Sequence, residues 1–450
     1  MALQFTRDVQ VAIKLDGDIW EVPVLDGFSF SQAINSSEIT VSESGATSRR
    51  GRLLFNDSLA PVEWSLSTYA RPTLHSSQAR CIEEALWAMY VGASSFVDST
   101  GVFNGTASPT TAANTLVAGT TNTFNLTQSD VSAMSEGFEI YFMFKPTGGT
   151  NQVYKITKAA VNSVTIDFDI DGIATIQWSG FGSELSDEGT TIVSPTITAG
   201  IDSTTNFIRN RISTVSLARE DLLIGAPGAA ELTSISGAIT DTGGTDNTFV
   251  VAGNVTAVAV AGLGIQGTGI AADTTVTSST HDGASPGETT IVLSNVTTEA
   301  VASPKVFTLK KDVYNIVLTG GSINFENNIS YLTPEELGQV NKPLGNITGT
   351  RSISGNLTCY LDNDSTNSKS GELFADLVSD SDTVRNNFNL VINIGGATAP
   401  ALSFSMPTAH LEVPVVNVED LLTLDIAFHA QPSGGNIDTQ NEATIIYKVA

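Results

Sequence analysis

The stretch that decides the fold covers residues 55–72 and reads FNDSLAPVEWSLSTYARP. Apolar side chains such as Trp64 and Leu66 alternate with polar ones along most of its length. A second stretch, residues 345–361 (GNITGTRSISGNLTCYL), alternates in the same way. A period of two is typical of a β-strand with one buried face. Both stretches are therefore predicted to be strands.

The sequences around these two strands also correspond. Residues 77–91 follow the first strand and carry apolar side chains at the three- and four-residue spacing of one helix face. A shorter segment with similar residues, 370–378, follows the second strand. The matching segments upstream of the strands are residues 28–32 (FSFSQ) and 323–327 (INFEN). We interpret the chain as one domain used twice.

Length and charge narrow the classes of function. A chain of 450 residues is long enough for about two to four domains with cores of their own. It carries 21 Lys and Arg against 47 Asp and Glu, and the resulting net charge of −26 is spread along the whole sequence. Proteins that grip nucleic-acid phosphates need clustered Lys and Arg, so this composition argues against such a protein. It suits a protein that must repel nucleic acid.

The remaining composition indicates a β-rich protein with many turns. Only 15% of the residues are charged, and 39 are Gly. Cys81 and Cys359 stand in a periodic helix and a periodic strand, which predicts buried free thiols rather than a disulfide. The N-terminal residues show no apolar signal core, and no run of about 18 apolar residues occurs. We therefore expect assembly in a host cytoplasm and no membrane partner.

Three domains are expected. The first spans residues 1–205, and the second is discontinuous, with residues 206–218 and 309–450. Between the two parts of the second domain lies an acidic segment, residues 219–308, in which short apolar runs are separated by Gly. This pattern predicts a small all-β module inserted at a hairpin tip, where an insertion disturbs its host domain least.

Three runs of sequence carry a resemblance to a known family. They are SRRGRLLFNDSLAPVEWSLSTYARP at residues 48–72, EEALWAMY at 83–90 and ENNISYLTPEELGQVNKPLGNITGTRSISGNLTCYL at 326–361. The chain resembles the major tail tube proteins of long-tailed bacteriophages (Caudoviricetes), except in the insert and the loop after Phe103. The resemblance implies a mainly β fold with two tandem β-sandwich or partial-barrel domains, each flanked by an α-helix. The insert resembles the small immunoglobulin-like or related β modules that decorate tail exteriors.

The resemblance also implies a structural protein of the viral tail. In this family six copies of one domain usually form a ring, and stacked rings form a hollow tube through which genomic DNA passes during ejection. A chain with two such domains would close the same ring with three copies, so we expect a homotrimeric ring with pseudo-sixfold symmetry. A homohexamer is the alternative. The implied partners are further copies of the chain, a tape-measure protein, DNA passing transiently through the lumen, and tail terminator, baseplate or sheath proteins.

The candidate lining of such a tube is the most regular alternation in the chain, residues 163–171. Its apolar side chains point one way, while Asp167, Asp169 and Asp171 point the other way, about 7 Å apart. Rows of carboxylates around a ring would repel DNA phosphates and let the duplex slide. A solvated outer face is the alternative interpretation of the same pattern.

Two polar segments, residues 31–51 and 327–345, are predicted to be long exposed loops. Loops of this length in compact domains are usually functional or disordered. Three arginines in the first loop concentrate positive charge in an acidic protein, and we expect them to pair with glutamates in the second loop of a neighbouring subunit. An ordinary salt-bridged surface is the alternative. The candidates for contacts between subunits or rings are Glu38, Glu43, Arg49, Arg50, Arg52, Glu335, Glu336 and Lys342.

Motifs for metals, cofactors and catalysis are incomplete. Asp167 begins a run like a calcium-binding loop, but Trp178 stands at the twelfth position, where a bidentate Glu is required. Gly262, Gly264 and Gly267 have the spacing of a dinucleotide-binding turn, yet no helix pattern follows them. The four histidines are scattered without metal-ligand spacing. We expect no enzyme activity, no cofactor and no metal.

Two other classes of protein have a similar composition. A surface adhesin with a glycan-binding β module would need a secretion signal, which is not seen here. A glycan-degrading tail enzyme would need paired carboxylates in a cleft, usually on a β-helix with a short repeat. The expected function is therefore a structural subunit of the tail tube, with an adhesin or another structural or decoration protein of the tail as the alternative.

Overall fold

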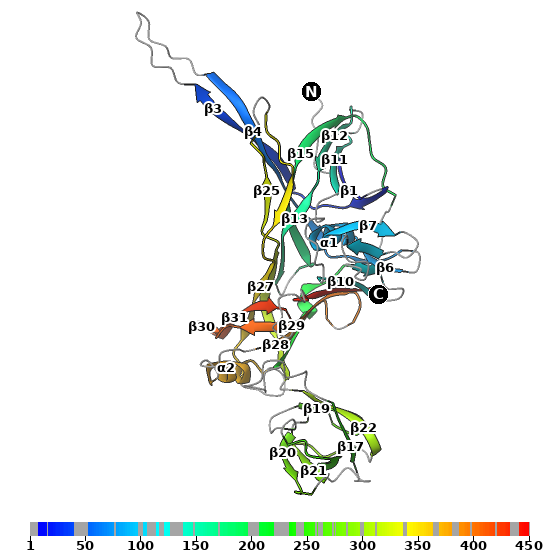
Figure 1. Cartoon of the computed structure of the whole chain (residues 1–450), viewed down its shortest axis with the longest axis vertical. Helices are drawn as coiled ribbons and strands as arrows, with labels where there is room; N and C mark the ends of the chain where they lie inside the picture. The colour runs from blue at the N-terminus through cyan, green and yellow to red at the C-terminus, as the bar shows by residue number, and fades with distance from the viewer. Residues whose placement is uncertain are drawn as a thin grey trace, which may run out of the picture.

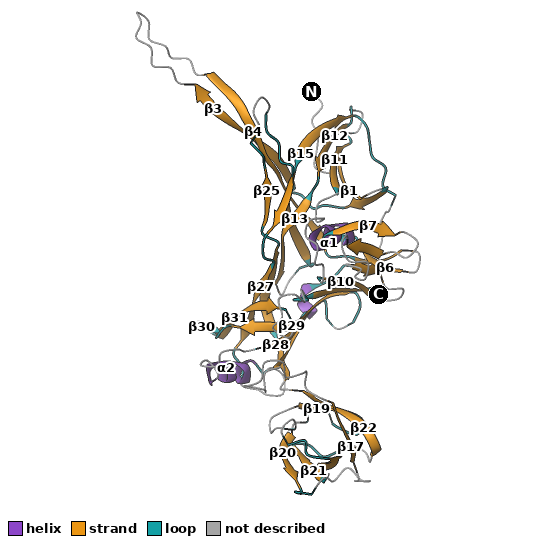
Figure 2. Ribbon diagram, in the orientation of Figure 1, coloured by secondary structure: helices purple, strands orange, loops and turns teal. Residues whose placement is uncertain are grey.

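Strands dominate the computed structural model, and its described residues include two α-helices (Figure 2). The structure describes residues 8–15, 17–39, 53–75, 78–97, 102–105, 114–116, 121–126, 138–146, 149–169, 172–196, 207–219, 234–239, 247–256, 259, 264–271, 274, 276–284, 287–297, 301–310, 313–335, 340–362, 369–379, 387–396, 398–418, 421–432 and 441–449. The predicted mainly β fold is confirmed.

One long antiparallel sheet, which we call the central sheet, runs through the body of the molecule (Figure 1). Its strands lie in the order β3 (Ser29–Ile39), β4 (Leu53–Tyr69), β14 (Thr175–Gly182), β13 (Ala160–Asp169), β24 (Leu318–Glu326), β27 (Ser352–Tyr360) and β31 (Leu422–Gln431). Beyond β31 lie the C-terminal end of β29 (Ala401–Leu411) and β30 (Val415–Val418). The two stretches that decided the fold are β4 and the β26–β27 region, so both strand predictions are confirmed.

The two halves of the chain contribute to the central sheet in the same order. In the first half, the strands lie in the spatial order β3, β4, β14 and β13, so the last two are reversed relative to the sequence. In the second half, the order is β24, β27, β31 and then β29–β30, with the same reversal. β13 and β24 join the halves, with Val164 opposite Phe325 and Asp167 opposite Ser322. We call this pairing the internal joint.

A second layer of strands covers the core face of the central sheet. In the first half its order is β15 (Glu184–Gly189), β12 (Gln152–Thr157), β11 (Glu139–Phe144), β1 (Val9–Leu15) and β2 (Asp18–Val22). In the second half the corresponding order is β32 (Thr444–Lys448), the start of β29, β28 (Phe388–Ile394), β16 (Thr214–Arg219) and β23 (Val313–Ile316). The 3-10 helix η3 (Asn210–Ile212) precedes β16.

Four strands of the first half extend the second layer in the second half. These are β10 (Thr121–Asn125), which pairs with β32, and then β9 (Asn114–Leu116), β8 (Val102–Gly105) and β7 (Ala93–Val97). The segment after Phe103 was expected to be a loop, and for its described residues this was wrong. The extended backbone is stabilised there by pairing with a distant strand, which the local Thr- and Asn-rich sequence does not reveal.

Helix α1 (Glu84–Val91) lies at the centre of the core, and all its residues are buried. The Trp87 ring packs 4.8 Å from Trp178 of the first half and 5.7 Å from Phe325 of the second half. Its Nε1 donates a 2.8 Å hydrogen bond to the hydroxyl of Tyr447. One continuous hydrophobic core therefore spans both halves. The second helix, α2 (Ser370–Ser379), matches its prediction, and no described helix is long and apolar enough to cross a membrane.

The helix predicted for residues 77–91 is shorter than expected. Its first part forms β6 (Gln78–Cys81), which pairs with β5 (Pro72–His75). Because α1 is buried on every side, no polar face marks where the helix begins, and pairing with β5 overrides the local helical spacing. Cys81 thus lies in a strand rather than a helix, and it and Cys359 are buried free thiols, as predicted.

The segment between β16 and β23 forms a sheet of its own (Figure 1). The order is β19 (Gly264–Gln266), β22 (Val301–Lys310), β17 (Ser234–Ile239), β18 (Thr248–Ala252), β21 (Glu288–Leu293) and β20 (Val276–His281). It has a separate core in which the Phe249 and Phe307 rings lie 4.9 Å apart. Leu309 belongs to this core, so the last strand ends two residues beyond the expected boundary at 308.

Candidate assembly interface

The face of the central sheet that points away from the core is polar and carries no Lys or Arg. None of the described strands of this sheet contains a basic residue other than histidine. Hydroxyl and amide side chains cover most of the face, as where the Ser322 hydroxyl donates to Asn356 Oδ1 at 2.6 Å. The acidic residues on it are Glu63, Asp167, Asp169, Glu326 and Asp425.

Two of the three predicted lining residues lie beside the internal joint. Asp167 and Asp169 point from β13 to the polar face, where both are exposed, and Asp167 lies opposite Thr175 of β14 and Ser322 of β24. Partial burial, and secondly the carboxylate of Asp169, raise the pKa of Asp167 above its ordinary value. Asp171 lies outside the described residues. Among the described residues, no group of three His, Cys, Asp or Glu could hold a metal ion.

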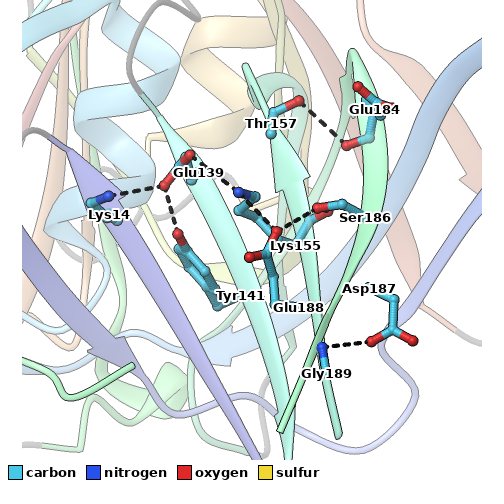
Figure 3. A network of polar contacts seen from close by, with 10 residues as sticks. All are labelled: Lys14, Glu139, Tyr141, Lys155, Thr157, Glu184, Ser186, Asp187, Glu188 and Gly189. Carbon is cyan, nitrogen blue, oxygen red and sulfur yellow. Dashed lines mark hydrogen bonds and ion pairs between the residues drawn. The ribbon is translucent and has the colours of Figure 1, made fainter. Parts of the chain in front are cut away.

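The second layer of the first half has a different character, because several of its charges are paired. Lys14 Nζ lies 3.2 Å from Glu139 Oε2, and Lys155 Nζ lies 2.8 Å from Glu188 Oε1 (Figure 3). The Tyr141 hydroxyl also donates to Glu139, at 2.7 Å. The hydrogen bond to Glu188 raises the pKa of Lys155, and the same contact lowers the pKa of Glu188. Uncompensated negative charge is thus a property of the central sheet rather than of every surface.

The central sheet ends in two open edges. Among the described strands, β3 pairs only with β4, and residues 410–418 pair only with β31. Val413, Val415 and Val418 are exposed along the second edge. A strand with unpaired backbone groups and exposed apolar side chains is a ready site for another strand. Both ends of the sheet are therefore able to accept a partner strand.

The described part of the first predicted loop, residues 31–39, is strand rather than loop. β3 continues to Ile39, and its end pairs with the start of β4, so that Glu38 lies opposite Leu54 in a strand rather than a loop. Figure 1 shows the paired ends of β3 and β4 projecting from the body. Polar residues in this stretch suggested a loop, but cross-strand pairing fixes an extended backbone. The candidates Glu43, Arg49, Arg50 and Arg52 lie outside the described residues.

The second predicted loop also contains a hairpin, β25 (Ile329–Leu332) with β26 (Gly345–Thr348). Lys342, expected to contact another subunit, forms a 2.6 Å ion pair with Glu184 of the same chain. That contact does not require a second subunit. Glu335 is exposed and Glu336 lies outside the described residues.

Comparison with known proteins supports the family resemblance. No family model matches the chain. It is 25% identical over 446 residues to the tail tube protein pb6 of Escherichia phage T5, a match that covers 96% of this chain and 74% of that protein. The chain is therefore similar to a phage tail tube protein along nearly its whole length. This similarity confirms the family resemblance predicted from the sequence, and it supports the predicted structural function and place in the virion tail.

The sequence analysis missed several residues that shape these surfaces. Glu63, Glu326 and Asp425 share the polar face with the predicted aspartates, and the absence of Lys and Arg from every strand of that sheet was a readable signal. The exposed apolar residues at the edge and at the hairpin tip are visible only as the short runs VVNV and LLF. Such runs are usually assigned to a core.

Proposed function

We propose that three copies of this tail tube protein close a ring with pseudo-sixfold symmetry, and that rings stack into a hollow tube with the polar face of the central sheet as its wall. The observation that carries the proposal is the repeated strand order, which gives each chain two equivalent units joined side by side. The role is structural, without catalysis.

The internal joint supplies a template for the joint between chains. Strand positions correspond between the halves. We match Phe30 with Phe325, which lie opposite Trp64 and Ile353 respectively in the equivalent strand pairs. Extending the match across β14 and β31 places Leu411 where the first half has Val164. By this register Leu411 of one chain lies opposite Phe30 of the next. The two open edges thus complement each other.

The electrostatics of the polar face suit a conduit for DNA. Acidic side chains without Lys or Arg repel phosphates, and a low-dielectric wall strengthens the field inside a narrow lumen. Repulsion prevents the duplex from sticking, so that it slides. We further propose that a tape-measure protein fills the lumen before DNA does, and that the insert decorates the exterior.

Charge reversal at Asp167 and Asp169 tests the conduit. Phage carrying Asp167→Lys and Asp169→Lys should form tubes of normal appearance but eject DNA slowly and incompletely, because cations on the wall bind phosphates. The matched control reverses Asp187 of β15 and Glu288 of β21, which are exposed outside the central sheet, and should eject DNA normally. Normal ejection by the first variant would refute the lumen assignment.

The mass of a single released ring tests the stoichiometry. Native mass spectrometry should give three times the chain mass of 47.1 kDa. A ring of six whole chains would give twice that value and would overturn the trimer. Purified chains that never form rings under tube-forming conditions would contradict the proposed assembly itself.

A further inference from the structure

Two hairpins occupy equivalent places in the two halves. The first is the tip of β3–β4, residues 34–39 with 53–59, which we call the arm. The second is β25–β26. Ile34 lies opposite Leu59 in the arm, and Ile329 lies opposite Thr348 in β25–β26. The same register that matches Phe30 with Phe325 also matches these pairs.

The β25–β26 hairpin and the segment that joins its strands dock on the first half of the same chain. Asn341 forms a parallel bridge with Ser58 of β4, in which the Leu59 amide donates to the Asn341 carbonyl at 2.8 Å. The Asn341 amide in turn donates to the Asp57 carbonyl at 3.1 Å. Polar contacts at Tyr331, Lys342 and Leu344 attach the rest of the segment to Lys158 and Glu184.

The arm has exposed apolar side chains where its counterpart has docking contacts. Leu53 is 67% exposed, Leu54 64% and Phe55 50%, although all three stand in a strand. Of their counterparts by register, Lys342 pairs with Glu184, and the Leu344 carbonyl accepts a hydrogen bond from Lys158, although the Leu344 side chain is itself 58% exposed. Apolar residues clustered at a projecting hairpin tip indicate an interaction surface.

The second half presents the surface that matches the docking site on the first half. β26 corresponds to residues 56–59 of β4, and among the described strands it pairs only with β25. The Gly349 amide donates to the Asn328 carbonyl at 3.0 Å, so by the alternation of an antiparallel ladder the Thr348 amide and the Asn346 carbonyl point to the free edge. Asn346 Nδ2 is buried there and has no hydrogen-bond partner among the described residues.

We infer that the arm of one copy docks on β26 of the neighbouring copy in the same ring, adding a short parallel strand at the free edge beside Asn346–Thr348. The inference rests on the proposed ring. It reuses the contact that Asn341 makes with β4 inside each chain, and strand addition of this kind derives its affinity from backbone hydrogen bonds. It assigns the arm to a lateral contact within one ring.

A cysteine pair tests the docking directly. By register Leu53 of one copy lies beside Thr348 of the next, as Lys342 lies beside Leu59 within a chain, and strand neighbours are close enough for a disulfide. Oxidised single rings of Leu53→Cys with Thr348→Cys should give covalent dimers and trimers on non-reducing gels. The control, Lys342→Cys with Leu59→Cys, should lose its free thiols without forming oligomers. Background is low because Cys81 and Cys359 are buried.

The outcomes separate the docking from the proposed function. Rings of the expected mass with free thiols at both positions would overturn the docking and leave the tube intact. Cross-links that form only in stacked tubes would place the arm on the next ring and also overturn it. Failure to form rings at all would count against the proposed assembly. A ladder beyond the trimer would contradict the three-copy ring but support the docking.

A second variant guards against a disulfide that fails for geometric reasons. Leu53→Asp with Leu54→Asp should raise the concentration needed for ring formation at least tenfold, since it places charges in the docked surface. Val306→Asp, on an equally exposed apolar residue of the insert, is the matched control and should leave assembly unchanged. Unchanged assembly by the arm variant would refute the docking.

Discussion

In the first half of the chain, the residue that precedes the helix is Glu83, and in the second half a buried serine, Ser370, begins the helix at the corresponding place. One Glu83 oxygen accepts a 2.9 Å hydrogen bond from the Arg71 amide, just beyond β4. The Ser370 hydroxyl accepts a 2.9 Å bond from the Asp362 amide, just beyond β27. In both halves a backbone amide just beyond the strand is satisfied from the start of the helix, once by a carboxyl group and once by a hydroxyl.

The surroundings of the two helices explain this difference. α1 is covered by β7 and β10. Its first residue, Glu84, is therefore buried and pairs with the buried Arg80 of β6. α2 keeps Leu373 and Leu377 inside and leaves Glu372 exposed. Duplicated strands thus kept their pairing order, while side-chain chemistry followed what covers each copy.

The largest difference between the halves in the cost of a substitution to the free energy of unfolding is expected at the equivalent residues Phe30 and Phe325. Phe325 is fully buried against Trp87, Tyr90 and Phe404, so Phe325→Ala should lower the free energy of unfolding by about 3 to 5 kcal/mol. Phe30 is only partly buried, against Phe142, and Phe30→Ala should cost the isolated chain about 1 to 2 kcal/mol. Urea denaturation followed by tryptophan fluorescence measures both, and equal losses would contradict the difference between a closed joint and an open edge.

The next largest effect is expected beside α1. Arg80→Ala leaves the buried Glu84 carboxylate without its charged partner and should cost about 3 kcal/mol, near the lower end for a broken buried pair. The loss is limited because the Trp20 indole still donates to Glu84 at 2.9 Å. Lys369→Ala is the control in the second half, where the 4.0 Å pair with Glu372 is partly exposed, and should cost under about 0.5 kcal/mol. Thermal unfolding would contradict this contrast if the two losses were similar.

Period-two alternation was a sufficient guide to the strands. It placed β4, β13, β14 and β27 correctly because one face of each is buried and the other is solvated. It failed where burial is uniform or absent. The arm has no buried side, so no alternation identified it. The helix that contains α1 was predicted from its apolar spacing but was begun too early, because α1 has no polar side to mark its start.

The candidate site was only partly predictable, for a topological reason. Asp167 and Asp169 were found because they alternate within one strand, but Glu326 and Asp425 reach the same face only through pairing between strands distant in sequence. Lys342 was expected to face another subunit, and its partner, Glu184, comes from the other half of the same chain. Local sequence does not report such long-range neighbours.

A smaller and pH-dependent effect is expected from the carboxyl group that the second half lacks. Burial raises the pKa of Glu83 to about 8. The folded state therefore holds a proton that the unfolded chain releases near pH 4.5, so this contribution to stability is fully present below that pH and is lost as the pH rises to about 8. Glu83→Gln keeps the acceptor for the Arg71 amide and removes the titration. At pH 9 its free energy of unfolding should be higher than that of the native chain, and near pH 4.5 the two should be about equal. If the free energies of unfolding of the variant and the native chain differed by the same amount at both pH values, Glu83 would be excluded as the cause.

The smallest effect is expected at the ion pair between the docked segment and the first half. Lys342 and Glu184 are both about half exposed, so Lys342→Ala should cost about 0.5 kcal/mol, and less at high salt, because solvent screens such pairs. The docking should persist because the Asn341 bridge with β4 is made by backbone groups. Hydrogen exchange at the Leu59 amide reports that bridge, and it should remain as protected in the variant as in the native chain. Loss of protection there would show that the ion pair, rather than the strand contact, holds the hairpin, and would weaken the case that an arm without an equivalent lysine docks in the same way.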